Sequence, residues 1–153
     1  GGASLSVERD SVIDFAFDGS PKQIPSSVVV EGWDYNTKQK VVGNASSGDV
    51  IKIGSGELAL GDSERKIVDS QVSDQSMAKV MAVAELNRLA RTAVRGTCTV
   101  QGTPDLYAGV VMKIPDQQQS ANAEVMVVSA RHRVSNKTGL VTQVTFCSNT
   151  KPK

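Results

Sequence analysis

The feature that most constrains the fold is a run of strand-like segments, broken by turn residues, over residues 96–147. Gly102, Pro104 and Gly109 stand where the backbone has to reverse or bulge. Between such breaks, apolar and β-branched residues alternate with polar ones, as in strands that bury one face. The pattern therefore predicts antiparallel strands joined by short turns. The predicted strands are Thr97–Gln101, Ala108–Ile114, Glu124–Val134 and Leu140–Cys147.

One helix is predicted before this region, from Asp74 or Ser76 to Arg95. Either of the first two residues can cap the first turn, and the interior is rich in Ala, Leu, Met, Glu and Arg. Gly96 is expected to end the helix as its C-terminal cap. The stripe predicted to pack on a sheet consists of Val83, Leu86, Ala90, Ala93 and Val94.

The first half of the chain predicts further strands. Residues 11–18 alternate apolar and polar side chains, and Val28–Trp33 is followed by a hairpin return at Lys40–Val42. Val50–Ile53 predicts another strand, and residues 54–73 an exposed loop. The expected fold class is α+β, mostly β: an antiparallel β-barrel-like domain with one long helix.

One domain is expected over residues 11–147 of the 153 in the chain. Residues 1–10 are interpreted as an N-terminal extension or a cloning remnant, and residues 148–153 as a flexible polar tail. The chain shows neither a signal peptide nor an apolar run of membrane-spanning length, so no stable membrane association is predicted.

Charge and cysteine content exclude several classes of function. A formal net charge of +1 leaves no basic stripe for phosphates, so nucleic-acid binding is not expected. Cys98 and Cys147 are too far apart for a C-x-x-C motif and are expected to be free, buried thiols. A disulfide between them would require neighbouring strands.

Two motifs suggest sites but lack the context that a site requires. Gly54–Ala59 fits the dinucleotide fingerprint G-x-G-x-x-A, with Asp74 near the position of the ribose-binding acid, but glycine and polar residues interrupt the helix that must follow. His132 is the only histidine and is predicted to be buried and hydrogen-bonded rather than catalytic, because a general base needs a matched partner.

The remaining charged groups leave one alternative open. Arg88, Arg91 and Arg95 align near the end of the predicted helix, either as solvated charges that favour the helix dipole or as a contact strip for an acidic partner. The pairs Asp14 with Asp18 and Glu57 with Asp62 are interpreted as solvated faces. No catalytic, cofactor-binding or metal-ligating residue is predicted.

The order of several short motifs resembles the barrel region of phage tail baseplate hub proteins. A strand ends in Gly32, Trp33 and Asp34, a hairpin returns, and an Ala-rich helix leads into the strand at Thr97. The later matches are Gly102, Pro104, Leu106 and Gly109, then Val128–His132, then Val141–Phe146. The family that this sequence resembles includes the late control protein D family and the VgrG spike protein of type VI secretion.

This resemblance implies an assembly component that joins an inner tube to a spike, without chemistry of its own. It implies a homotrimer in the full-length protein, with inner tube and baseplate proteins as partners. The location implied is the bacterial cytoplasm or a virion or injection particle, with export through the contractile apparatus. The oligonucleotide-binding-type neck and β-helical spike of the family are not in this sequence. The residues implied to be architectural are Gly32, Trp33, Asp34, Gly102, Pro104, Gly109 and His132.

Two other functions are weighed against this one. A carbohydrate- or ligand-binding β-domain would present exposed aromatic side chains, for which Trp33, Tyr35 and Tyr107 are available. A cell-wall hydrolase would need paired acids in a cleft, for instance among Asp14, Asp18 and Glu124.

Overall fold

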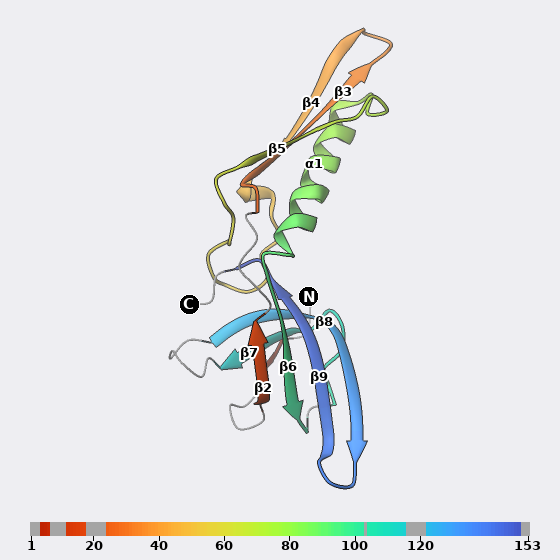
Figure 1. The fold of residues 1–153 in the computed structure, drawn as a ribbon. Coiled ribbons are helices and arrows are strands. Elements are labelled where there is room, and N and C mark those ends of the chain that lie inside the picture. Colours follow the sequence, from red (N-terminus) through yellow and green to blue (C-terminus); the bar gives the residue numbers. More distant parts are fainter. Residues whose placement is uncertain (1–3, 7–11, 18–23, 103, 116–121, 151–153) are drawn as a thin grey trace. The chain divides into compact units, whose positions relative to one another are not determined.

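The structure is a computed structural model that describes residues 4–6, 12–17, 24–102, 104–115 and 122–150. The fold is α+β and mostly β, with one α-helix among the described residues, which confirms the predicted fold class (Figure 1). Backbone contacts divide the chain into two compact units. The first unit takes its residues from 1–21, 52–58 and 94–153, and the second from 22–51 and 59–93.

A curled six-stranded sheet forms the first unit, in the order β1-β7-β8-β9-β6-β2. Within this sheet the β1–β7 pair is parallel and the other pairs of described strands are antiparallel, and the sheet makes a half-barrel. The parallel strand β1 was not predicted. The strands are β1 Ser4–Ser6, β2 Val12–Phe17, β6 Val94–Gln101, β7 Val111–Pro115, β8 Asn122–Ser135 and β9 Gly139–Ser148.

The core of this unit lies on one face of the curled sheet. Alternate residues of β6 and β9 point into it, so that Cys98 lies opposite Val144 and Gly96 opposite Phe146. Both cysteines are buried thiols outside any disulfide, as predicted, and burial raises the pKa of the Cys98 thiol to about 11. The core consists of Cys98, Val100, Leu106, Met112, Ile114, Val125, Val127, Val144 and Phe146.

A bulge in β8 changes which residues face the core. Val125 and Val127 are buried, but the register shifts between Val127 and Ser129, and Val128 is exposed. An extra residue in one strand reverses the alternation beyond it. Unbroken alternation had predicted that His132 shares a face with Met126, but the bulge places the two residues on opposite faces.

The second unit packs one helix on a three-stranded sheet of order β4-β3-β5. Every second residue of β3 is buried, and the buried side chains of α1 recur at every fourth position. The two patterns match because one strand face and one helix stripe meet. The elements are β3 Ser27–Asp34, β4 Gln39–Ala45, the 3₁₀ helix η2 Ser47–Asp49, β5 Glu64–Val68 and α1 Gln75–Ala90.

The helix ends earlier than the sequence predicted. Asp74 is the N-cap and accepts a hydrogen bond from the Ser76 backbone N–H, but α1 stops at Ala90. Strand β6 begins at Val94, where pairing with Ser148 takes over from helical hydrogen bonds. Gly96 is accordingly a strand residue and not a helix cap. Leu86, Ala90 and Ala93 of the predicted stripe are buried, whereas Val83 and Val94 are only partly so.

Two predicted backbone assignments in the first half of the chain are wrong. Residues 50–53 form no strand, because side-chain amides satisfy this backbone: Ile51 N–H donates to Asn87 Oδ1 and Ile53 N–H to Asn149 Oδ1, both at 2.8 Å. The predicted loop at 54–73 contains β5, which pairs in parallel with β3.

The predicted tail begins inside the fold. Ser148, Asn149 and Thr150 are buried, and the Thr150 hydroxyl donates to the carbonyl oxygen of Ile53 at 2.9 Å. Residues 148–150 are therefore packed rather than flexible, and 151–153 lie outside the described residues.

Candidate functional site

Gly32, Trp33 and Asp34 lie at the end of β3, where the chain passes close to the segment after β5. A Cβ atom at Gly32 would stand 2.0 Å from the Val72 carbonyl oxygen, which accepts a hydrogen bond from the Trp33 N–H at 2.8 Å. Asp34 accepts backbone hydrogen bonds from Asn36 and Thr37, which hold the pKa of its carboxyl below the usual range. The three residues fix a close backbone approach and the following turn.

Gly102, Pro104 and Gly109 surround the loop between β6 and β7. Gly102 has φ +71° and Gly109 has φ +94°, both in the region that favours glycine. The Gly102 N–H donates to Leu140 O at 2.9 Å, and the Gly109 N–H donates to Val127 O at 2.8 Å. The two glycines thus tie the ends of this loop to β9 and β8.

Replacing Gly109 with alanine is expected to lower stability by about 1–2 kcal/mol, through backbone conformation alone. A Cβ atom at this position would have no neighbour within 4 Å, so no steric clash contributes. Thermal unfolding of Gly109→Ala beside the adjacent exposed variant Ala108→Ser measures the effect. Equal melting temperatures for the two variants would contradict the positive φ.

His132 is exposed, contrary to the sequence prediction, but both of its ring nitrogens are hydrogen-bonded. Nδ1 lies 2.8 Å from Thr142 Oγ1, and Nε2 lies 3.0 Å from the Leu106 carbonyl oxygen. A carbonyl oxygen can only accept, so Nε2 carries a proton, and in the neutral ring Nδ1 accepts from the Thr142 hydroxyl. The side chain joins β8, β9 and the loop before β7.

The glycine-rich loop at residues 54–56 holds a carboxylate of the chain itself. Ser55 donates to Glu124 Oε2 through both its backbone N–H and its hydroxyl, the latter at 3.0 Å. Lys113 Nζ lies 3.6 Å from the other carboxylate oxygen. The hydrogen bonds from Ser55, above all that of its backbone N–H, hold the pKa of Glu124 below its usual range. The loop is followed by irregular backbone and not by a helix.

This arrangement predicts a pH-dependent contribution to stability. Because the pKa of Glu124 is lower in the folded state, the ionised carboxylate stabilises the fold above the unfolded pKa, and protonation removes this contribution as the pH falls. Glu124→Gln should be less stable than the wild type by about 1 kcal/mol at neutral pH, and the difference should shrink below about pH 4. Urea unfolding at several pH values tests this. A difference that grows with acid would contradict it.

The three arginines of the predicted strip do not lie on one helix. Arg88 is in the last turn of α1 and Arg91 follows that helix, but Arg95 is on β6, opposite Cys147. The early end of α1 is the reason. Arg88 is also paired: its guanidinium lies 2.7 Å from Glu85 Oε1 and holds the pKa of that carboxyl below its usual range.

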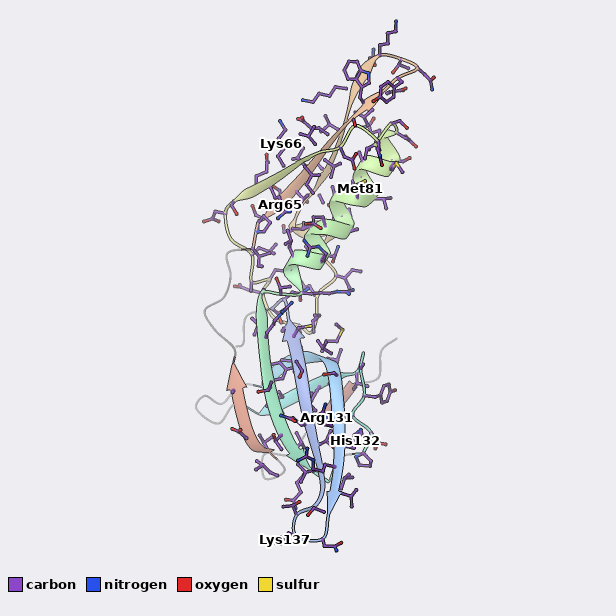
Figure 2. The ribbon with its side chains drawn as sticks, turned by 45° about the vertical axis from the view of Figure 1, so that its right-hand side comes forward. Arg65, Lys66, Met81, Arg131, His132 and Lys137 are labelled. Carbon is purple, nitrogen blue, oxygen red and sulfur yellow. The ribbon has the colours of Figure 1, made fainter. Side chains whose placement is uncertain are left out.

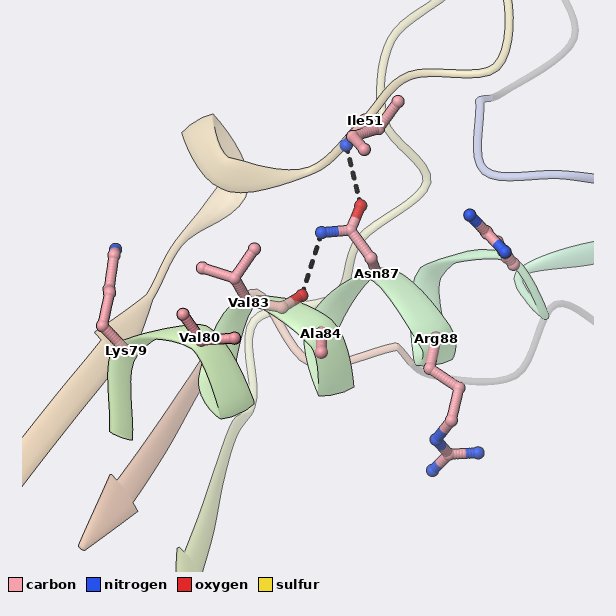
Figure 3. A pocket seen from close by; sticks show the side chains of 8 residues that line it. Ile51, Lys79, Val80, Val83, Ala84, Asn87 and Arg88 are labelled. Atoms are coloured by element: carbon pink, nitrogen blue, oxygen red, sulfur yellow. Dashed lines mark hydrogen bonds between the residues drawn. The ribbon is translucent and has the colours of Figure 1, made fainter. Parts of the chain in front are cut away.

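A groove of about 530 Å³ lies along the exposed side of α1 (Figure 3). Asn87 shapes it: Oδ1 accepts from Ile51 N–H, and Nδ2 donates to Val83 O at 2.9 Å. The bond from Ile51 holds the segment after η2 against the helix. The groove is lined by Ile51, Lys79, Val80, Val83, Ala84, Asn87, Arg88 and Arg91.

The groove belongs to a helix that is apolar on two sides. Besides its buried stripe, α1 exposes 51% of Met77 and 67% of Val80, and Ile51 beside it is 72% exposed. A helix with apolar residues on opposite faces is typical of one covered on both sides. Sequence reasoning missed this second face, although Met77, Val80 and Ala84 repeat at helical spacing.

The described residues bring together few groups that could bind a metal ion or take part in catalysis. Within those ranges no group of three or more His, Cys, Asp or Glu side chains is placed to hold a metal ion, and no helix has the length and apolar character needed to cross a membrane. Asp14 and Glu57 are exposed, and Asp18 lies outside the described residues. Trp33 and Tyr35 belong to the second unit and Tyr107 to the first.

Comparison with solved structures identifies the architecture. A tail protein from Neisseria meningitidis matches with a TM-score of 0.61 at 15% identity, over 96% of this chain and 44% of that one. A 43 kDa prophage tail protein from Shewanella oneidensis matches with a TM-score of 0.61 at 16% identity, over 95% and 41%. The prophage tail protein gp18 from Listeria monocytogenes matches with a TM-score of 0.53 at 14% identity, over 98% and 44%.

The chain has the fold of a part of each of these tail proteins. It spans less than half the length of each of the three. No protein-family profile matches the sequence, and a search of curated proteins finds no match. The likeness therefore lies in the fold, which is shared over nearly the whole of this chain.

Proposed function

We propose that this chain is a structural part of a phage tail or related injection apparatus, in the baseplate hub that joins the inner tube to the spike. The observation that supports this most is the tail-protein fold, which extends over at least 95% of the chain in three solved structures. The hub position itself rests on the order of sequence motifs around Gly32, Gly102 and Gly109. The partners proposed are inner tube and baseplate proteins, and the role is not enzymatic.

The proposed working state is a homotrimer of the full-length protein. Among the described residues, strands β1 and β2 stand at the two ends of the sheet order in the first unit, and an end strand is where a neighbouring subunit can add a strand. In the second unit, the exposed face of α1 offers Met77, Val80 and Ile51 to a covering surface. Such features are expected of subunits whose strand edges and apolar faces are covered by neighbours in a symmetric oligomer.

Its proposed location is the bacterial cytoplasm during assembly and then the virion or injection particle. In the organism that carries the gene, particles should be purified and their proteins quantified by mass spectrometry. We expect peptides of this chain at a few copies per particle. A gene deletion should abolish assembled tails, because the inner tube would lack the component that joins it to the spike. Particles that contain no such peptides and assemble normally after deletion would overturn the proposal.

A further inference from the structure

The part of the β8–β9 hairpin that lies beyond Glu124 is cationic and carries no acidic residue. None of the 16 acidic residues of the chain lies after Glu124. The cationic hairpin, defined as residues 128–145, exposes Arg131, Arg133 and Lys137. Figure 2 shows Arg131 on this arm and Lys137 at its turn. The arm therefore concentrates positive charge although the whole chain carries only +1.

Within the part of the chain that the structure describes, these three cations form no ion pair. In the second unit, by contrast, Lys40 and Lys66 both contact Glu31, at 2.7 and 3.0 Å. Like charges on one arm repel one another, and a carboxylate-bearing surface would relieve that repulsion.

The arm presents these charges in a fixed arrangement. Arg131 lies opposite Gln143 and Arg133 opposite Val141, so both arginines lie on one face of the ladder, about 6.7 Å apart along the strand. On the other face, His132 ties the arm to Thr142 and Leu106. Because the backbone is already ordered, a partner would have to immobilise only the side chains.

Exposed valines on the same arm distinguish between partners. Val134, on the face that carries His132, is 78% exposed, and Val128 is 51% exposed. Arginine together with exposed apolar side chains is typical of protein interfaces, whereas nucleic-acid interfaces are more polar and more densely basic. We propose that the cationic hairpin docks on a carboxylate-rich protein surface of a neighbouring subunit in the particle. This inference rests on the proposed function.

A zero-length carbodiimide cross-linker tests the contact directly in purified particles, since it joins a lysine amine to a carboxylate. We expect Lys137 to be linked to an Asp or Glu that belongs to another polypeptide. A particle that contains this protein but gives no such link would overturn the docking inference while leaving the proposed function intact. A particle without the protein would overturn the proposed function instead.

A charge-matched pair of triple variants supplies the second test. Arg131→Gln/Arg133→Gln/Lys137→Gln should lower incorporation into particles about tenfold, because it removes the complementary charge. The control Lys38→Gln/Lys52→Gln/Arg95→Gln removes the same charge from other exposed positions and should incorporate normally. Circular dichroism verifies that both fold. Equal incorporation would overturn the inference, and so would duplex DNA binding by the wild type that only the hairpin variant loses.

Discussion

Replacing Gly43 with alanine is expected to cost about 3 kcal/mol or more of the stability of the second unit. A Cβ atom at Gly43 would stand 2.2 Å from the carbonyl carbon of Ala78 and 2.4 Å from the backbone nitrogen of Lys79. Both neighbours are backbone atoms of α1, so no side-chain rotation relieves the clash. The helix would have to move away from β4, and the packing of Ala82 and Leu86 would loosen with it.

Gly48 provides the matched control for this substitution. It lies in the same unit, and a Cβ atom there would meet only the Ser46 hydroxyl oxygen at 3.9 Å. Urea unfolding followed by the helical circular dichroism signal should show Gly48→Ala within about 1 kcal/mol of the wild type. Equal midpoints for Gly43→Ala and Gly48→Ala would contradict the contact between helix and strand.

Phe146→Ala is expected to destabilise the first unit by about 3–5 kcal/mol. Phe146 is fully buried in the core of the curled sheet, and its ring occupies the space left by the missing side chain of Gly96, where a Cβ atom would stand 2.5 Å from the ring. Removing the ring opens a cavity that the strands around it are too constrained to fill.

The neighbouring residue in β9 supplies the comparison. Thr145 is exposed on the opposite face of the same strand, so Thr145→Ala should change the unfolding free energy by only about 0.5 kcal/mol. Measured by urea unfolding, Phe146→Ala and Thr145→Ala should differ by several kcal/mol. Similar values would contradict the placement of the core on the face of the sheet that carries Phe146.

The strands were predictable where a single alternating pattern decides the backbone. The hairpin of β3 and β4 and the last strand β9 follow from alternation and turn residues alone. The helix was predicted too long because Thr92, Ala93 and Val94 are compatible with both helix and strand. The pairing of Val94 with Ser148 determines that the strand begins there. Such long-range pairing leaves no local signal.

Other differences have the same origin. Strand β5 reads as a polar loop because four of its five residues are exposed, and its pairing with β3 is visible only in three dimensions. Residues 50–53 are apolar enough for a strand, yet the amides of Asn87 and Asn149 capture their N–H groups. An apolar pattern cannot distinguish a strand partner from a side chain that replaces it.

The features of the candidate sites also differ in whether the sequence could predict them. Glycines with positive φ, such as Gly109, were recognisable because turns demand them. The face of β8 on which His132 lies was not, since the bulge between Val127 and Ser129 has no sequence signature of its own. The second apolar face of α1 was present in the sequence as Met77, Val80 and Ala84. When a helix has two apolar faces, however, the sequence does not indicate which of them packs on the sheet.

The molecular mass of the natural full-length protein that contains this chain tests the central claim most directly. Mass photometry at low protein concentration, with and without the purified inner tube protein, should report three copies of the subunit. The addition of tube protein should then give a larger complex that still contains three copies. A strictly monomeric full-length protein that does not bind the tube protein would contradict the account.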